Sequence, residues 1–588
     1  MRRFRPKLQV RAPYKASKLE NAMSLKSRIT PDHAVLAGLL LTAGVYLQDL
    51  RYDFVIDDVP LILMNQATLT WQNVKTVFTT DVFFQPGPHI PTLMSAVHYR
   101  PIFMLWLMVN QQLFGSVFPW WHLTSLLLHL CVVFLVYQLA VNILKERWTA
   151  ALAAMLFAFH PIHVESVSYV SASTDLLVAL FLLLSFLCYW RFREQGASPA
   201  YLAIAVFTAV LAMLSKETAV MFPWILISYE ALRERPSGSK FQWTRLVWTL
   251  PFFAVVGMYG IVRTLLLGDN LGSRPGGIRL SAFADAPLVL ITYLRNLLWS
   301  VHLSFFYPYE WASKWTFLKG SAVVLLAAAS LWLWNRYRNR PGLRIQILWM
   351  AILFVPVILA ISAFDKEDWV HDRHMYLVSV PFSLIVAALL ADAKFPRKAS
   401  LIASGLILAV LCVETAVQVP RFSDGLALFE SALRVAPHDA LAHRYYAVTL
   451  CSYGRCEDAL AEYRIAAELA PNNAASYGSY GEALSIVGRN EEAVAQYAKA
   501  LQITPRSSPY RPFLLYRLAA IKVSDSKPVE GEAYLREAIQ LDPYSPNYHA
   551  ILADALRQQG RTNEASQEMQ LRAILQKNPT RAASVSAQ

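Results

Sequence analysis

Long apolar stretches separated by short polar loops fill roughly the first 420 residues of this sequence. A membrane-spanning helix needs about 20 mostly apolar residues, and eleven stretches reach or approach that length. They lie at 33–49, 119–143, 148–163, 173–192, 199–215, 218–233, 246–266, 318–335, 345–362, 375–392 and 400–417. Two further apolar segments, 100–114 and 286–304, contain arginine and asparagine, so we predict interfacial or re-entrant helices there. The pattern predicts a multi-spanning helical membrane domain over residues 33–420.

The pattern changes after residue 420, where prolines recur at an almost constant interval. Pro437, Pro471, Pro505 and Pro543 lie 34, 34 and 38 residues apart. A period of 34 residues is that of the tetratricopeptide repeat, a pair of packed helices. We therefore predict an α-solenoid over residues 421–578, with a last helix pair at 544–575 as its cap, and a disordered tail at 579–588. The fold class is all-α, and the solenoid is expected to bind a peptide or another protein.

Lysine and arginine in short loops set the orientation of a membrane protein, because they stay on the cytoplasmic side. Residues 1–32 form a basic tail, and further basic loops lie at 144–147, 190–194, 233–245, 336–344 and 393–399. With eleven spans, all of these segments fall on one side of the membrane. We therefore expect a cytoplasmic N-terminus and a non-cytoplasmic solenoid. The first apolar run has no small-residue cleavage site after it, so we predict a retained anchor.

The composition agrees with a membrane protein and argues against a soluble protein and against a nucleic-acid-binding protein. The chain is 55% hydrophobic and 16% charged, whereas soluble domains are about 25% charged. A net charge of +13 could indicate nucleic-acid binding, but the basic residues cluster at the ends of apolar runs, so no nucleic-acid partner is expected. The five cysteines form no CxxC pair. Cys451 and Cys456 could bridge a helix turn, but two unpaired thiols are the interpretation we favour.

Ionisable residues next to membrane spans are candidates for function, because they are costly there. Asp57 and Asp58 follow the first span and could act as a general base or bind a divalent cation; the alternative is an ordinary acidic loop. His160, His163 and Glu165 lie at the outer end of the third predicted span. They could bind a metal, orient an acceptor through hydrogen bonds or form a structural turn that breaks at a proline.

The remaining candidates lie on the same membrane face, and the cations among them suit an anionic substrate. Asp175 begins a span, where a carboxylate also suits a helix N-terminus. Lys216 and Glu217 lie between two apolar runs and could pair with each other or meet an anionic headgroup. Arg373 lies at the mouth of the span at 375–392, beside Tyr376, and arginine suits phosphate through its forked donors. Arg100 is a lesser candidate of the same kind.

The motifs, taken in order, resemble a known family. YDFVIDDVPLILMNQ, HYRPIFMLWLMVNQQLFG, WWHLTSLLLHL, FAFHPIHVESVSYVSASTDLL, LSKETAVMFP and DRHMYLVSVPF precede the repeats. This series is similar to that of the transmembrane and tetratricopeptide-repeat O-mannosyltransferases and their bacterial relatives, members of the GT-C superfamily of glycosyltransferases. The similarity extends from about residue 50 to residue 575. The short repeat array favours a bacterial relative over an animal-type enzyme.

The resemblance implies an activity and assigns roles to the candidates. A polyprenyl-phosphate-linked sugar, such as dolichyl-phosphate mannose, would be transferred to a hydroxyl on the non-cytoplasmic face, usually that of protein Ser or Thr. The expected base is Asp57 or Asp58. The family's His-Pro-x-His-x-Glu, Ser-Lys-Glu and Asp/Glu-Arg-x-x-Tyr patterns match His160 to Glu165, Ser215 to Glu217, and Asp372 to Tyr376, with His374 where a tyrosine is common.

Three classes of function stay open on the sequence alone. The first is an inverting hexosyltransferase of the bacterial inner membrane with periplasmic repeats, or of the endoplasmic reticulum with luminal repeats. The sequence assigns no cofactor to such an enzyme, although a divalent metal ion is a candidate. The second is a non-enzymatic membrane scaffold that recruits partners through its repeats. The third is a transporter or flippase, which would favour ionisable groups near mid-bilayer and internal repeats.

Overall fold

The computed structural model describes residues 30–82, 98–233, 243–267, 280–307, 316–362, 369–392 and 396–577. The basic tail predicted at 1–32 lies outside these residues except for its last three, and the tail predicted at 579–588 lies wholly outside them. Every regular element within the described ranges is a helix or a helical turn. The predicted all-α fold class is therefore confirmed for these residues.

A helix occupies each of the eleven stretches that the sequence marks as a span. These helices are α2 (Pro31–Tyr46), α5 (Phe118–Leu144), α6 (Arg147–Ala158), α8 (Ser173–Glu194), α9 (Ala200–Met213), α10 (Phe222–Leu232), α11 (Leu250–Leu267), α14 (Thr316–Arg336), α15 (Pro341–Ile361), α16 (Ser379–Asp392) and α17 (Arg397–Gln418). Six helical segments in the described residues are long and apolar enough to cross a membrane, or seven if a bent pair counts as one span. The count of eleven spans stays a prediction.

Shorter elements gather at the end of the bundle that meets the solenoid. They include the two segments predicted as interfacial or re-entrant, α4 (Pro101–Phe114) and α12 (Ala286–Leu298). The others there are η2 (Leu47–Arg51), η3 (Val59–Leu63), η4 (Trp71–Asn73), α3 (Val74–Val77), η5 (Pro161–His163), α7 (Val164–Ser168), η6 (Val170–Ala172), η7 (Glu217–Met221), η10 (Leu280–Asp285), η11 (Ser300–His302), η13 (Asp372–Met375) and η14 (Val419–Phe422). One such element, η8 (Trp243–Thr249), lies at the other end, before α11.

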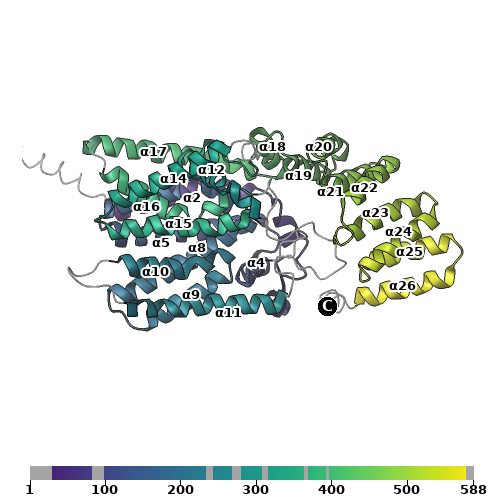
Figure 1. The fold of residues 1–588 in the computed structure, drawn as a ribbon, viewed down its shortest axis with the longest axis horizontal. Helices are drawn as coiled ribbons and strands as arrows, with labels where there is room; N and C mark the ends of the chain where they lie inside the picture. The colour runs from purple at the N-terminus through teal and green to yellow at the C-terminus, as the bar shows by residue number, and fades with distance from the viewer. Residues whose placement is uncertain are drawn as a thin grey trace, which may run out of the picture.

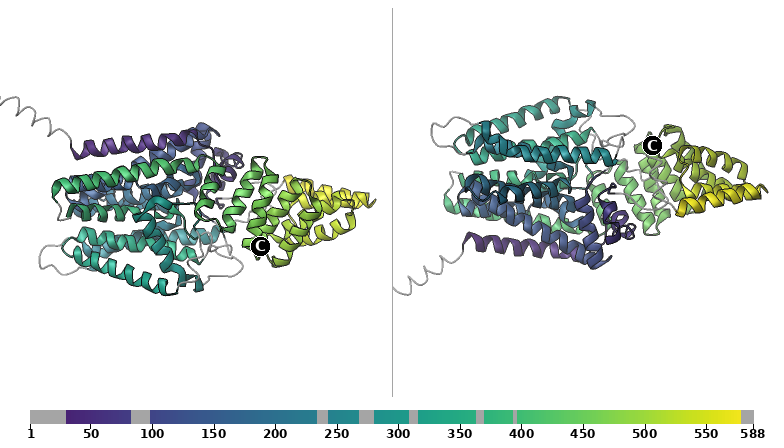
Figure 2. Two further views of the ribbon diagram at one scale, coloured as in Figure 1. Left: turned by 90° about the horizontal axis from the view of Figure 1, so that it is seen from above. Right: turned by 90° about the horizontal axis from the view of Figure 1, so that it is seen from below.

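The long helices run side by side, so the bundle has two distinct ends (Figure 1). Ion pairs join helix ends at one of them: Arg147 to Asp32 at 2.7 Å and Arg340 to Asp392 at 3.0 Å. The solenoid lies beyond the opposite end in all three views (Figures 1 and 2). The ends that carry these basic residues are therefore those farthest from the solenoid.

A break after α6 shapes the end of the bundle near the solenoid. α6 stops at Ala158, and the His160 side chain accepts a hydrogen bond from Ile162 N at 3.2 Å. Pro161 cannot continue a helix from the preceding turn, and the chain bends by 49° between Arg147–Ala158 and Pro161–Ser168. Residues 161–172 thus run as short turns instead of one rod, which brings several polar groups to the same place.

The solenoid begins after η14 with one helix, α18, and continues over the described residues as four pairs of antiparallel helices. These helices are α18 (Gly425–Val435), α19 (Ala440–Ser452), α20 (Cys456–Leu469), α21 (Ala474–Ile486), α22 (Asn490–Ile503), α23 (Arg511–Ser524), α24 (Pro528–Leu541), α25 (Pro546–Gln558) and α26 (Thr562–Lys577). Close packing within a pair depends on small residues. A Cβ atom at Gly481 would lie 3.0 Å from the ring of Tyr497 in the facing helix. The helix pair α25–α26 stands where the sequence predicts the cap.

Aromatic side chains fix the start of the solenoid to the membrane domain. Phe306, which follows η11, stacks on Phe429 of α18 and Tyr445 of α19 with ring centroids 6.2 and 5.8 Å away. Gln418 Nε2 also donates to the carbonyl of Ser300 at 2.6 Å, and the amide of Asp53 donates to the carbonyl of Ser423 at 3.0 Å. These contacts hold α18 against the loops that carry the candidate residues.

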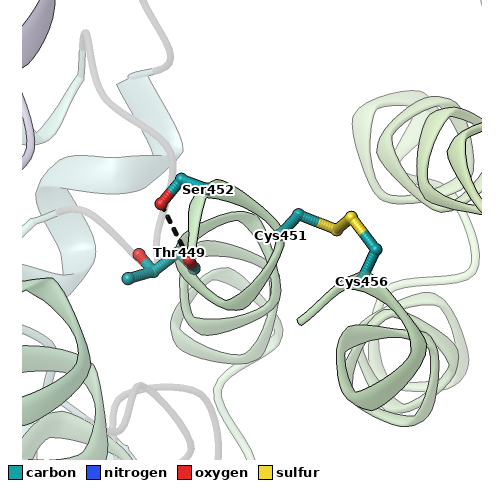
Figure 3. Close-up of a disulfide and its surroundings, with 4 residues drawn as sticks. All are labelled: Thr449, Cys451, Ser452 and Cys456. Carbon is teal, nitrogen blue, oxygen red and sulfur yellow. Dashed lines mark hydrogen bonds between the residues drawn. A yellow bond between two sulfur atoms is a disulfide. The ribbon is translucent and has the colours of Figure 1, made fainter. Parts of the chain in front are cut away.

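The prediction of two unpaired thiols at Cys451 and Cys456 is wrong, because the two residues form a disulfide. Figure 3 shows Cys451 near the end of one helix bonded to Cys456 at the start of the next. Between them the chain reverses through Gly454, whose φ of +77° is one that side-chain-bearing residues rarely adopt. The tight turn brings the two sulfur atoms together across α19 and α20.

Candidate active site

The adjacent carboxylates after the first helix differ sharply in their surroundings. Asp58 is fully buried, and its Oδ1 accepts hydrogen bonds from the amide of Ser171, at 2.7 Å, and from the hydroxyl of the same residue. Its Oδ2 accepts from Val55 N at 3.3 Å. Burial raises the pKa of Asp58 to about 7, although these hydrogen bonds oppose the rise. Asp58 therefore ties the loop to η6.

Asp57 is partly exposed, unlike its neighbour. Its backbone amide donates to the hydroxyl of Tyr169 at 3.3 Å. The preceding residue, Ile56, has a φ of +49°, which is strained for a β-branched side chain. Strained backbone of this kind gathers at functional sites, held by the surrounding structure. Of the two carboxylates, Asp57 is the one a substrate can reach.

Next to this loop, the buried carboxylate of Glu165 forms an ion pair with the partly exposed Arg373. Arg373 Nη1 lies 2.5 Å from Glu165 Oε1, and Arg373 N donates to Oε2 at 3.1 Å. His371 Nδ1 is 3.7 Å from the same carboxylate. Tyr169 lies close enough to Asp57, Asp58 and Arg373 for their charges to act on its hydroxyl. The helix break and η13 thus converge on the predicted base.

Asp372 precedes Arg373 in the chain but has different hydrogen-bond partners. It accepts hydrogen bonds from the hydroxyl of Tyr307, at 2.7 and 2.8 Å, and from Asn296 Nδ2 at 3.0 Å. Burial, with the nearby charge of Glu165 as a second cause, raises the pKa of Asp372 to about 8. Asp372 and its partners hold η13 against α12, which positions Arg373.

Lys216 and Glu217 do not pair with each other, which excludes one of the two interpretations open from the sequence. Lys216 Nζ lies 2.6 Å from both oxygens of Asp175 at the start of α8. Glu217 Oε2 instead accepts from Arg100 Nη2 at 2.8 Å and from Arg100 Nε at 3.0 Å. The charges of Arg100 and Arg373 both act on Lys216, so the three cations share one region.

These cations differ in how far solvent reaches them. The side chain of Arg373 is 23% exposed, that of Arg100 17% and that of Lys216 8%. Each is already paired with a carboxylate. Arg373 is the most accessible of the three to an anionic group.

The two histidines of the third candidate group point into the protein interior. His160 Nε2 contacts the carbonyl of Leu297 at 2.8 Å, and His163 Nε2 contacts Ser379 Oγ at 2.8 Å. Tyr376 hydroxyl contacts His129 Nδ1 at 2.7 Å, beside the ring of His163. The contacts of the two histidines join η5 to α12 and α16, and the contact of Tyr376 joins the turn before α16 to α5, which is a structural role. Only Glu165 of the His-x-x-His-x-Glu pattern reaches the carboxylate and arginine region.

A metal ion would find few ligands in the described part of the chain. Among them no group of three or more His, Cys, Asp and Glu side chains is arranged to hold an ion. The oxygens of Asp58 already accept hydrogen bonds from Ser171 and Val55. Binding of a divalent ion by Asp57 and Asp58 stays a prediction, which chelation during an activity assay tests.

Sequence reasoning missed the neutral residues that organise this region. No charge marks these residues in the sequence, yet each makes a contact given above: Ser171, Tyr169, Tyr307 and His129.

A small crevice of about 20 Å³ lies between Glu165 and Asp372 of the membrane domain and Leu428 and Ser431 of α18. The first helix of the solenoid therefore forms part of the wall beside the candidate site.

Comparison with known families finds two matches. Residues 99–259 match the family model described as dolichyl-phosphate-mannose-protein mannosyltransferase. This range contains the segment from Arg100 to Glu217 but neither Asp57 nor Arg373. Residues 453–510 match the tetratricopeptide repeat, which confirms the repeat type predicted from the proline spacing.

Curated relatives carry names of the same activity. The chain is 33% identical over 229 residues to Protein O-mannosyl-transferase TMTC1 of Mus musculus, covering 36% of this chain and 24% of that protein. It is 27% identical over 457 residues to Protein O-mannosyl-transferase TMTC4 of Homo sapiens, covering 66% and 60%. The match thus spans about a quarter of the first relative. The predicted resemblance to these transferases is confirmed.

Solved structures also show similarity. The oligosaccharyltransferase of Archaeoglobus fulgidus in its apo form is 13% identical with a TM-score of 0.39, over 68% of this chain and 56% of that one. The pilF protein of Pseudomonas aeruginosa is 27% identical with a TM-score of 0.24, over 25% of this chain and 64% of that one.

Proposed function

We propose, from the premise that this chain is a relative of the protein O-mannosyltransferases, that it is a membrane glycosyltransferase. It transfers mannose or another hexose from a polyprenyl-phosphate carrier to a hydroxyl group. The acceptor is a serine or threonine of a polypeptide. The reaction takes place at the end of the bundle that faces the solenoid.

The placement of Asp57 carries this proposal. A partly exposed carboxylate stands beside a fully buried one that is tied to Ser171, and the pair lies near the arginine that is most accessible to an anion. A base and a phosphate-binding cation are the two groups that a single displacement at a sugar phosphate needs. We assign Asp57 as the base and Asp58 as the residue that positions its loop.

The proposed reaction is one displacement. The carboxylate of Asp57 takes the proton of the acceptor hydroxyl as its oxygen bonds to the anomeric carbon. The bond between that carbon and the phosphate oxygen breaks, and the electron pair leaves with the polyprenyl phosphate. Arg373 stabilises the departing phosphate. Attack opposite the leaving group inverts the anomeric centre.

The other predicted donor-binding residues receive supporting roles. Lys216 is paired with Asp175 and is only 8% exposed, so we assign this pair to holding the turn that carries Glu217. Glu217 in turn orients Arg100. Glu165 orients Arg373, and His160, His163 and Tyr376 hold the surrounding helices together.

The solenoid is proposed to hold the acceptor polypeptide near this site. Its first helix is fixed beside Glu165 and Asp372, so a bound polypeptide would have a high local concentration there. The disulfide between Cys451 and Cys456 supports a compartment that oxidises thiols. The bacterial periplasm is such a compartment, and so is the lumen of the endoplasmic reticulum.

Mass spectrometry of exported proteins tests the proposal. Cell-envelope proteins from cells with and without this chain are digested and searched for hexose on serine and threonine. We expect specific sites to lose hexose when the chain is absent and to regain it when the chain is restored. Unchanged hexose occupancy at every site would contradict protein O-glycosylation and favour the scaffold.

A further inference from the structure

A second polar region lies at the end of the bundle away from the solenoid. It is a cavity of about 550 Å³ between the last turns of α8 and α10 and the short element η8. This cavity is here called the basic cavity. It is lined by Arg193, Arg233, Thr244, Arg245, Val247 and Trp248. α8 begins near Asp58 and continues for 22 residues to Glu194, about 33 Å at the rise of an α-helix. The basic cavity is thus far from the candidate active site.

Three guanidinium groups surround this cavity, and two carboxylates compensate them. Arg193 donates to Glu230 through Nε at 2.6 Å and Nη2 at 3.1 Å. Arg233 Nε lies 3.4 Å from Glu194 without a hydrogen bond. Arg245 makes no ion pair with any of the residues that the structure describes, and its Nη1 is buried without a hydrogen-bond partner there. The region therefore has more positive than negative charge.

A buried guanidinium nitrogen that lacks a partner is unfavourable. An anion in the cavity would supply that partner, and phosphate matches the planar donor fork of arginine. The cavity volume is ample for a phosphate with its glycerol substituents.

The rim of the cavity indicates where such a phosphate comes from. Trp243, Val247 and Leu250 are 76, 55 and 58% exposed, so aromatic and aliphatic side chains face outward beside the arginines. Tryptophan and arginine in this combination are typical of the level of lipid headgroups. Arg193 also lies over the ring of Trp248 at 5.7 Å, which holds the aromatic wall next to the charge.

We propose that the basic cavity binds the phosphate of an anionic phospholipid, with Arg245 as its principal ligand and Arg193 and Arg233 completing the charge. The acyl chains lie along the exposed apolar rim. The site is distinct from the sugar-transfer site in both position and ligand.

Native mass spectrometry of the full chain in detergent tests this proposal with phosphatidylglycerol and phosphatidylcholine as the lipid probes. We expect phosphatidylglycerol to bind at least about tenfold more tightly than phosphatidylcholine. Arg245→Gln should lower the affinity for phosphatidylglycerol by about tenfold. This variant removes no partner from a described ion pair, so the fold should persist, which elution on size exclusion verifies.

Arg338→Gln is the matched control, because Arg338 is exposed and follows α14 at the same end of the bundle. It should leave lipid binding unchanged. Equal loss of phosphatidylglycerol binding in the two variants, or equal binding of both lipids, would overturn the proposal.

Competition distinguishes a lipid ligand from free phosphate. Short-chain phosphatidylglycerol should displace the bound lipid, and inorganic phosphate at the same concentration should not. Equal displacement by inorganic phosphate would overturn the lipid assignment.

Discussion

The buried pair of Lys216 and Asp175 allows a sharp test of how the site is held together. The two side chains are 8 and 7% exposed, and the ammonium lies 2.6 Å from both carboxylate oxygens. Lys216→Met leaves the Asp175 carboxylate buried without its cation. Asp175→Leu leaves the Lys216 ammonium buried without its carboxylate. Each single variant should therefore lose stability, and the double variant should recover it.

The magnitudes follow from the burial of both groups. Removing one partner of a buried ion pair costs about 3–5 kcal/mol, whereas replacing both with apolar residues is often neutral or stabilising. The double variant K216M/D175L should therefore be about as stable as the parent chain. We expect sugar transfer to return with stability, because the pair is assigned to positioning.

Thermal unfolding of the purified full chain in detergent measures these effects, with transfer from a polyprenyl-phosphate sugar as the second readout. Arg147→Met is the control, because its pair with Asp32 is exposed at the other end of the bundle and should contribute little. A double variant as unstable as the single ones would refute the assignment. A stable but inactive double variant would show that the pair does more than position the turn.

Three further predictions concern other parts of the chain. Because burial raises the pKa of Asp58 to about 7 from 3.8, its contribution to the free energy of unfolding is full below about pH 4 and is lost as the pH rises through 7, a change of about 4 kcal/mol. Asp58→Asn should remove this dependence on pH from the free energy of unfolding measured between pH 4 and 8. Parallel pH profiles of the variant and the parent chain would contradict the claim. Cys451→Ser should cost about 2 kcal/mol for so short a loop, seen as a lower unfolding temperature that a reductant no longer affects; alkylation of both thiols in the unreduced parent chain would disprove the disulfide. Tyr445→Ala should loosen the stack with Phe306 and Phe429, so that limited proteolysis releases the solenoid faster, whereas the same change at Tyr453 outside the stack should not.

The positions of the helices could be predicted from the sequence because length and hydropathy are local properties. Each apolar run that the sequence marks as a span contains a helix, and Pro161 marks the break that it predicts. The solenoid followed from a repeated spacing, which is also a property of the chain alone. In each of these cases the signal lies within about 40 residues.

The partners of the charged residues could not be predicted in the same way. Lys216 and Glu217 are neighbours in sequence, but the turn between α9 and η7 directs one to α8 and the other to the start of α4. Ser171 and Tyr169 carry no charge, so nothing in the sequence connects them with the aspartates. The disulfide depended on the reversal at Gly454, which brings together two cysteines that the sequence alone led us to interpret as unpaired thiols.

The most direct test of the proposed activity compares Asp57→Asn with the parent chain. The purified full chain is reconstituted in vesicles with a polyprenyl-phosphate mannose labelled in the sugar, and envelope protein from cells lacking the chain serves as acceptor. Asp58→Asn serves as a comparison, because that change alters the buried support and leaves the carboxylate of Asp57. We expect labelled sugar to pass to protein with the parent chain. Asp57→Asn should lower the rate by at least about a hundredfold, and Asp58→Asn should retain part of the rate. Full transfer by Asp57→Asn would contradict the assignment of the base, and absence of transfer by the parent chain would contradict mannose as the transferred sugar.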